Sequence, residues 1–452
     1  MKLMNRMISS RQFARALQVV RALQVAVILG AMAAQTAVAA TLIEHADVYP
    51  VSRAVLPDTA VLIDAGKIKA IGADALAQAG SATRIDATGL RLYPGLISAN
   101  SSLGLIEIEA VRATVDTAEV GAVNPNARAQ VAVHADSDLL PVARAGGVLT
   151  ALSVPRGALI AGQSALINLS GWNYEEMTIK PAVAMHIYWP SVRIPEWLPK
   201  PAIEQALKAA AENLRILDVA FDDALAYRAK AALPNAKDRQ QDLRLEALQP
   251  VLKGELPLFI HANELTQIRG ALSFAAKYKL KLTLVGALDA WRLADELKAA
   301  NVQVILGSPF NLPMRRSESY DVLYSAAAKL NAAGVKIAIA GDGGGMDASL
   351  EKNIAYLAAQ AAAFGLPADQ ALRAVTLNAA EILGVSDRLG SIDVGKDANL
   401  ILVRGDVLEI TSPIKRIFIA GIDTPMNSRH TELCERYQGR YGVKNGDVCA
   451  SQ

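Results

Sequence analysis

Histidine and cysteine, two residue types that often carry acid–base, nucleophilic and metal-binding chemistry, are few in this chain, with five histidines and two cysteines among 452 residues. Residues 93–105 (YPGLISANSSLGL) combine a turn with an apolar strand that ends in Asn100 and Ser102. Residues two apart on a strand point to the same side, so these two side chains should face one surface. Ser102 would need a base to act as a nucleophile. Only His261 could serve, and no Gly-x-Ser-x-Gly elbow supports that chemistry.

This stretch resembles the first barrel strand of the metal-dependent amidohydrolase superfamily, the urease-related group that includes imidazolonepropionase-like proteins. In that family the strand contains Pro-Gly-Leu-Ile-Asp-Ala-His-x-His, and the two histidines bind zinc or a similar ion at the mouth of the barrel. Residues 94–99 keep the frame Pro-Gly-Leu-Ile-x-Ala, but Asn100 and Ser102 stand where the histidines would be.

The resemblance also implies further site residues. His261, in LFIHA, stands at the family's strand-five histidine, and Asp342, in IAGDGG, at its strand-eight aspartate, a metal ligand and general base. Gly286 replaces the strand-six histidine, and His186 stands where some relatives have a carboxylated lysine. The remaining pocket candidates are Asn263 and Arg315, the latter as a residue that could face a carboxylate substrate.

These residues leave the metal site incomplete, because catalytic zinc needs three protein ligands and the neutral oxygens of Asn100 and Ser102 bind transition metals weakly. We therefore expect no metal, and a catalytically impaired binding or scaffold subunit with a small-molecule ligand. Its partner would be an active amidohydrolase relative or a second copy of itself. The alternative is an active hydrolase of non-peptide or cyclic carbon–nitrogen bonds. It would use His261, Asp342 and a divalent metal such as zinc in a rearranged site.

The elements that must position these residues form an α/β pattern. From residue 94 to 386 apolar strands alternate with helical stretches, which predicts a TIM (β/α)8 barrel with its site at the C-terminal ends of the strands. The buried strands are expected at residues 147–154, 258–260, 282–285, 302–306 and 335–340, with helices at 290–300 and 349–363.

Short strand–turn–strand patterns flank this central region. Residues 40–93 and 387–425 should pair as one small composite β-sandwich domain, although the barrel separates them in sequence. Residues 426–452 form a C-terminal tail, and its two cysteines, Cys434 and Cys449, are expected to form a disulfide in an exported protein.

The chain starts with a basic segment, an apolar run and a small-residue motif at residues 37–39, which predicts a signal peptide over residues 1–39. The mature protein would then be exported, with the periplasm as its expected location, and would keep no integral membrane span. A net charge of +2 with interleaved acids and bases gives no support to nucleic-acid binding.

Overall fold

The computed structural model describes residues 40–193, 198–231 and 241–442. The predicted signal peptide and Cys449 lie outside these ranges, so cleavage, export and the disulfide stay predictions. The proposed domain boundaries also stay predictions. No helix in the described ranges is long and apolar enough to cross a membrane.

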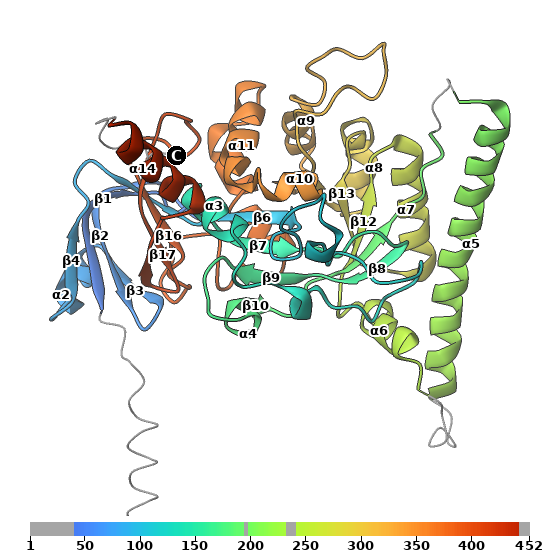
Figure 1. Ribbon diagram of the computed structural model, residues 1–452, viewed down its shortest axis with the longest axis horizontal. Helices are drawn as coiled ribbons and strands as arrows, with labels where there is room; N and C mark the ends of the chain where they lie inside the picture. The colour runs from blue at the N-terminus through green and yellow to red at the C-terminus, as the bar shows by residue number, and fades with distance from the viewer. Residues whose placement is uncertain (1–39, 194–197, 232–240, 443–452) are drawn as a thin grey trace, which may run out of the picture.

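Both ends of the chain build one β-sheet, as predicted. Figure 1 shows the blue N-terminal strands beside the red-brown C-terminal ones. The sheet has eight strands in the order β18-β17-β16-β5-β1-β2-β3, with β4 pairing β1. We predicted two facing sheets, whereas hydrogen bonds join all these strands into a single sheet. Its elements are β1 Thr41–Val48, β2 Leu56–Asp64, β3 Lys67–Ile71, α2 Ala73–Gln78, β4 Thr83–Asp86, β5 Arg91–Pro94, β16 Leu400–Val403, β17 Ile414–Ile419 and β18 Ile422–Thr424.

One buried side chain links this sheet to the central region. Asn399 donates from Nδ2 to Oδ1 of Asn168 at 2.7 Å, and its own Oδ1 accepts from the backbone N–H of Ala420 at 2.8 Å. A buried amide that lacks a hydrogen-bond partner costs free energy. The two hydrogen bonds of Asn399 therefore favour one arrangement of the terminal sheet against the central region.

The central region has two ladders of strands around a shared apolar interior. Four strands follow the order β10-β9-β7-β6, and six follow the order β15-β14-β13-β12-β11-β8. β6 runs parallel to β7, and β11 to β15 run parallel to one another, whereas β8 and β9 are antiparallel to their neighbours. The strands are β6 Leu96–Ser101, β7 Val148–Ser153, β8 Ile160–Gln163, β9 Ala165–Asn168, β10 Thr178–Lys180, β11 Met185–Tyr188, β12 Leu258–Ala262, β13 Leu282–Gly286, β14 Gln303–Leu306 and β15 Ile337–Ile339.

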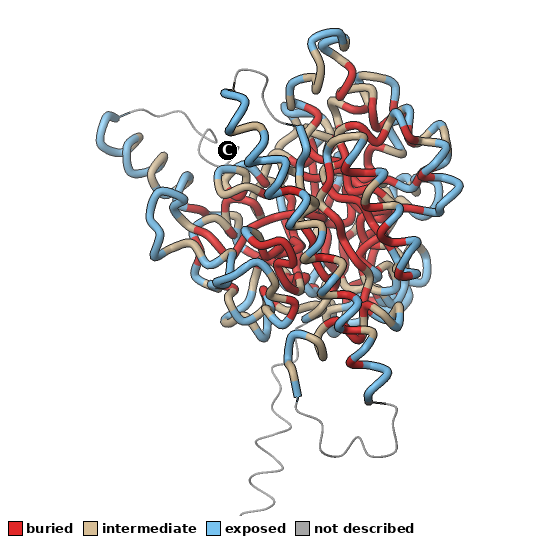
Figure 2. The backbone as a smooth tube through the Cα atoms, turned by 90° about the vertical axis from the view of Figure 1, so that its right-hand side faces the viewer, coloured by how far each residue is buried: buried red, intermediate tan, exposed pale blue. Residues whose placement is uncertain are grey.

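The interior between the two ladders is filled by side chains from strands of both, including Ile97, Leu152, Phe259, Val285 and Ile305. Figure 2 shows the buried segments gathered in the middle of the molecule. The expected eightfold repeat is incomplete, since β7, β8 and β9 follow one another with no helix between them.

Helices cover the outside of the parallel strands (Figure 1). The long α5 and the shorter α6 lie between β11 and β12 in sequence, α7 follows β12, and α11 to α13 follow β15. The helices and 3-10 turns of this region and the tail are η1 Arg112–Thr114, η2 Ala129–Ala132, α3 Leu139–Ala145, α4 Tyr174–Met177, α5 Lys200–Ala231, α6 Leu243–Leu252, α7 Leu265–Tyr278, η4 Ala290–Leu293, α8 Ala294–Ala299, α9 Ala326–Ala332, α10 Gly345–Ala348, η5 Glu351–Asn353, α11 Ile354–Ala363, α12 Ala368–Ala374, α13 Leu377–Ile382 and α14 Arg429–Tyr441.

Candidate functional site

Two neighbouring parallel strands bring the histidines together. In the register of β11 and β12, His186 is opposite Phe259 and Tyr188 is opposite His261. Because Phe259 belongs to the interior cluster, the side chains two positions apart on each strand face the same interior. His186 Nδ1 lies 2.9 Å from His261 Nε2, and the Tyr188 ring stacks on the His261 ring with centroids 4.0 Å apart.

Burial keeps both imidazoles neutral. It lowers the pKa of His186 to about 3, with the nearby Arg156 charge adding to the effect. Burial also lowers the pKa of His261 well below its usual value, and the repulsion that a protonated His261 would feel from a protonated His186 and from Arg156 lowers it further. In a pair of neutral imidazoles one ring donates to the other, so each ring nitrogen at the contact is already engaged.

Asp342 follows β15, but its carboxylate faces the loop after β14. Oδ1 accepts from the backbone N–H of Ser308 at 3.1 Å, and Oδ2 accepts from Nδ2 of Asn311 at 2.9 Å. Gly307 permits this arrangement, because a Cβ there would lie only 2.6 Å from Asp342 Oδ1. Burial raises the pKa of Asp342, while the hydrogen bonds from Asn311 and Ser308 oppose that rise.

Asn100 and Ser102 both reach the loop that follows β15. Asn100 donates from Nδ2 to the carbonyl of Gly341, and Ser102 donates from Oγ to the carbonyl of Gly344, each at 3.0 Å. Both side chains are buried, and Asn100 Oδ1 has no hydrogen-bond partner among the described residues. Asn100 and Ser102 are therefore neutral side chains that tie β6 to the loop after β15.

Arg156 is the residue of the site that we did not predict. It follows β7 and donates from Nη1 to the backbone carbonyl of Asp342 at 2.9 Å, and its guanidinium carbon lies 5.8 Å from the centre of the Tyr188 ring. A Cβ at Gly343 would lie 2.6 Å from Arg156 Nη1 and 2.9 Å from Asn100 Nδ2, so the two side chains converge there. Its position in the sequence, just after a barrel strand, could have marked Arg156 as a site residue, since sites of this fold lie at the C-terminal strand ends.

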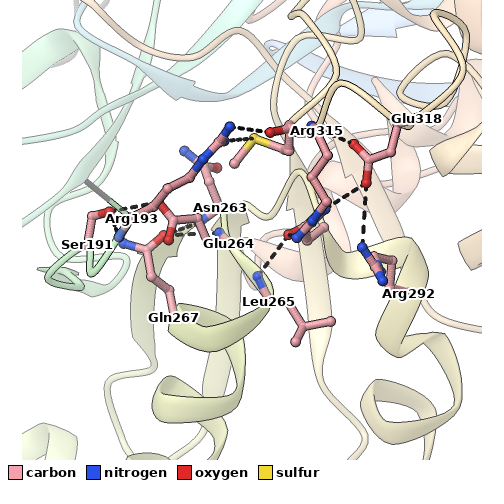
Figure 3. Close-up of polar contacts among 11 residues, drawn as sticks. Ser191, Arg193, Asn263, Glu264, Leu265, Gln267, Arg292, Arg315 and Glu318 are labelled. Carbon is pink, nitrogen blue, oxygen red and sulfur yellow. Dashed lines mark hydrogen bonds and ion pairs between the residues drawn. The ribbon is translucent and has the colours of Figure 1, made fainter. Parts of the chain in front are cut away.

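The other predicted pocket residues lie nearer to the loops after β12 to β14. Asn263 Oδ1 lies 2.3 Å from the position of a Cβ on Gly286, whose φ is +81°, so a histidine would not fit there without moving Asn263. Arg315 forms a bidentate ion pair with Asp289, in which Nη1 donates to Oδ1 at 2.8 Å and Nη2 donates to Oδ2 at 2.6 Å. Its Nη1 also donates to Oε1 of Glu318 at 2.6 Å (Figure 3). Its charge is thus paired within the protein, and its proposed contact with a substrate carboxylate stays untested.

Residues 264–427 match the family described as the Amidohydrolase family. An imidazolonepropionase of Mesorhizobium japonicum is 27% identical over 175 residues, which are 38% of this chain and 40% of that protein. An imidazolonepropionase of Rhizobium meliloti is 30% identical over 175 residues, 38% of this chain and 39% of that protein. The chain therefore spans about two fifths of the length of these curated relatives.

Solved structures extend the amidohydrolase likeness to most of the fold. The structure of an amidohydrolase from Thermotoga maritima superposes with a TM-score of 0.75 and 24% identity, covering 85% of this chain and 99% of that one. At this identity the likeness concerns the fold alone. It agrees with an α/β amidohydrolase fold that carries an extra β-sheet built from both termini.

The buried histidine pair should make the stability of the amidohydrolase-like barrel sensitive to acid. Both folded pKa values lie below the usual 6.5, so the unfolded chain binds more protons as the pH falls below about 6.5. The stabilisation is complete above about pH 6.5 and declines on acidification, by up to about 1.4 kcal/mol per pH unit for each histidine. The free energy of unfolding, measured with urea at several pH values, should fall less steeply on acidification for the double variant His186→Gln/His261→Gln than for the unmodified protein.

The control is His134→Gln, at an exposed position. This variant should leave the dependence of the unfolding free energy on pH unchanged. Buried Glu351 acts in the opposite direction, because burial raises its pKa to about 7. Its contribution to the free energy of unfolding is complete below the usual pKa of a glutamate and is lost as the pH rises through 7. It is present in every variant and cancels from the difference in slopes. Equal slopes for the histidine variant and the unmodified protein would show that the pair is not buried and neutral.

Proposed function

We propose that this protein is a metal-free ligand-binding member of the amidohydrolase fold. The observation that carries the proposal is the position of the Arg156 guanidinium, which contacts the loop of Asp342 beside Asn100 and His186. A divalent ion a few ångströms from this cation would be repelled by several kcal/mol, even at the moderate effective dielectric of a protein.

The donor groups support the same proposal. His186 and His261 are engaged with each other, and the Asp342 carboxylate is held by Ser308 and Asn311. In the described ranges, no three histidine, cysteine, aspartate or glutamate side chains lie together as a metal-binding group would require. The residues present therefore do not fit the zinc centre that the family resemblance implies, and we derive no catalytic step through a metal.

We further propose that the protein acts as a binding or scaffold subunit outside the cytoplasm. The signal-like residues 1–39 support export to the periplasm, and the pairing of Cys434 with Cys449 would follow there. An active amidohydrolase relative or a second copy of the chain would be its protein partner.

An active carbon–nitrogen hydrolase is the second candidate. The match of residues 264–427 to the Amidohydrolase family favours it, because that family is named for hydrolysis. His261 and Asp342 would then be the catalytic pair. For them to act on one substrate atom, the Asp342 carboxylate would have to leave Ser308 and Asn311.

Metal analysis of the protein purified from its native host, without chelators, separates the two candidates. We expect far less than one transition-metal ion per chain by plasma mass spectrometry, because the donor set cannot hold one. The adenosine deaminase from Xanthomonas campestris, whose solved structure holds zinc, serves as a positive control for metal retention through the same purification. One bound ion per chain would overturn the metal-free proposal and favour the hydrolase.

A further inference from the structure

The Arg156 side chain has unused binding capacity. It is half-buried, and in the described part of the chain it forms no ion pair. A guanidinium has five N–H donors, and the one hydrogen bond found for this side chain uses Nη1, with the Asp342 carbonyl as acceptor. A carbonyl dipole does not neutralise a full positive charge, so the site is suited to an anion.

Two other buried polar atoms of the site also lack partners. Asn100 Oδ1 and His186 Nε2 are both buried and have no hydrogen-bond partner among the described residues. Asn100 is 3% exposed and His186 is 0% exposed, so bulk water does not reach them freely. A buried polar atom without a partner costs about 1–3 kcal/mol. His186 Nε2 can donate to a bound anion when its Nδ1 accepts from His261, whereas Asn100 Oδ1 is an acceptor and needs an O–H or N–H donor elsewhere on the ligand.

We propose that Arg156 binds the carboxylate of a small organic acid, which lies across the mouth of the barrel beside Asn100 and Tyr188. This inference rests on the proposed ligand-binding function and supplies the ligand's chemical class. A planar carboxylate matches the fork of a guanidinium with two parallel hydrogen bonds. The Tyr188 ring stacks on the His261 ring, and the Arg156 guanidinium carbon lies 5.8 Å from its centre, which places the arginine beside the histidine pair.

The surrounding acids favour a single negative charge on the ligand. Asp347 accepts a hydrogen bond from the N–H of Gly344 at 2.7 Å, and Glu109 lies within 2.7 Å of the position of a Cβ on Gly345. With the Asp342 carboxylate also nearby, a second negative charge would face repulsion. The ligand is therefore a monocarboxylate rather than a phosphate dianion.

Thermal shift and calorimetry with defined probes test this proposal. The probes are aliphatic, aromatic and heteroaromatic monocarboxylic acids, each paired with its primary amide, together with phenyl phosphate as a dianion. At least one acid should stabilise the full-length protein, while its amide and phenyl phosphate should not. Arg156→Gln should weaken binding of that acid at least about tenfold, since the charge-assisted bonds are lost. Arg156→Lys should retain part of the affinity, because it keeps the charge without the fork.

The matched control is Arg316→Gln, an exposed arginine in the loop after β14, which should bind the acid like the unmodified protein. The inference is overturned if no acid binds, if acid and amide bind equally, or if Arg156→Gln keeps full affinity. Metal content is measured on the same samples. Binding that disappears with a chelator and returns with zinc would refute the metal-free function itself, whereas metal-free binding independent of Arg156 would refute this inference alone.

Discussion

Zinc affinity should rise at least about a hundredfold when Asn100→His and Ser102→His are combined with Arg156→Met. The two histidines supply imidazoles at the positions where the family resemblance implies them, and methionine removes the competing positive charge. Relief of repulsion between a divalent ion and a guanidinium is worth several kcal/mol at an effective dielectric of about 20. Imidazoles in place of neutral oxygens add to the gain. Calorimetric titration with zinc at neutral pH measures the effect.

Two control variants isolate the contribution of Arg156. Asn100→His/Ser102→His, with the arginine kept, should bind zinc much more weakly than the triple variant. Arg156→Met alone should remain a weak binder, because His186 and His261 stay paired with each other. Thermal unfolding of each variant checks that the new histidines, which replace buried side chains, leave the barrel folded. Similar affinities for the double and triple variants would mean that the guanidinium does not occupy the metal's place.

Loss of the Asp289 carboxylate should destabilise the protein by about 3 kcal/mol, the second large effect that the structure predicts. Asp289 is buried, and besides Arg315 its Oδ2 also accepts from the backbone N–H of Leu265 at 2.9 Å, at the start of α7. Asp289→Ala therefore removes a helix-end hydrogen bond and leaves a guanidinium without its main partner. Urea unfolding at neutral pH measures the change in the free energy of unfolding.

The exposed pair of Arg269 and Glu296 provides the matched comparison, with side chains 55% and 48% exposed. Glu296→Ala should cost no more than about 1 kcal/mol, because water screens a surface ion pair. In a double-mutant cycle, Arg315→Ala should add little once Asp289 is gone. Equal costs for Asp289→Ala and Glu296→Ala would show that the Asp289 contacts do not hold the loop after β14.

Local patterns in the sequence were sufficient for most of the regular elements. The apolar runs at residues 258–260, 282–285 and 302–306 became β12, β13 and β14, because a buried parallel strand needs apolar side chains on both faces. The helical pattern at 290–300 became η4 followed by α8. The pairing of both chain ends in one sheet followed from turn and strand signals that repeat on either side of the barrel.

Residue types at the strand ends determined where the site lies, but only tertiary contacts decided its chemistry. Asp342 is oriented by Ser308 and Asn311 from another strand end, and Arg156 reaches the mouth from the end of β7. The pairing of His186 with His261 likewise depends on the register between two strands separated by two helices. No local propensity encodes such contacts, because each joins residues distant in sequence whose meeting depends on how the whole barrel packs.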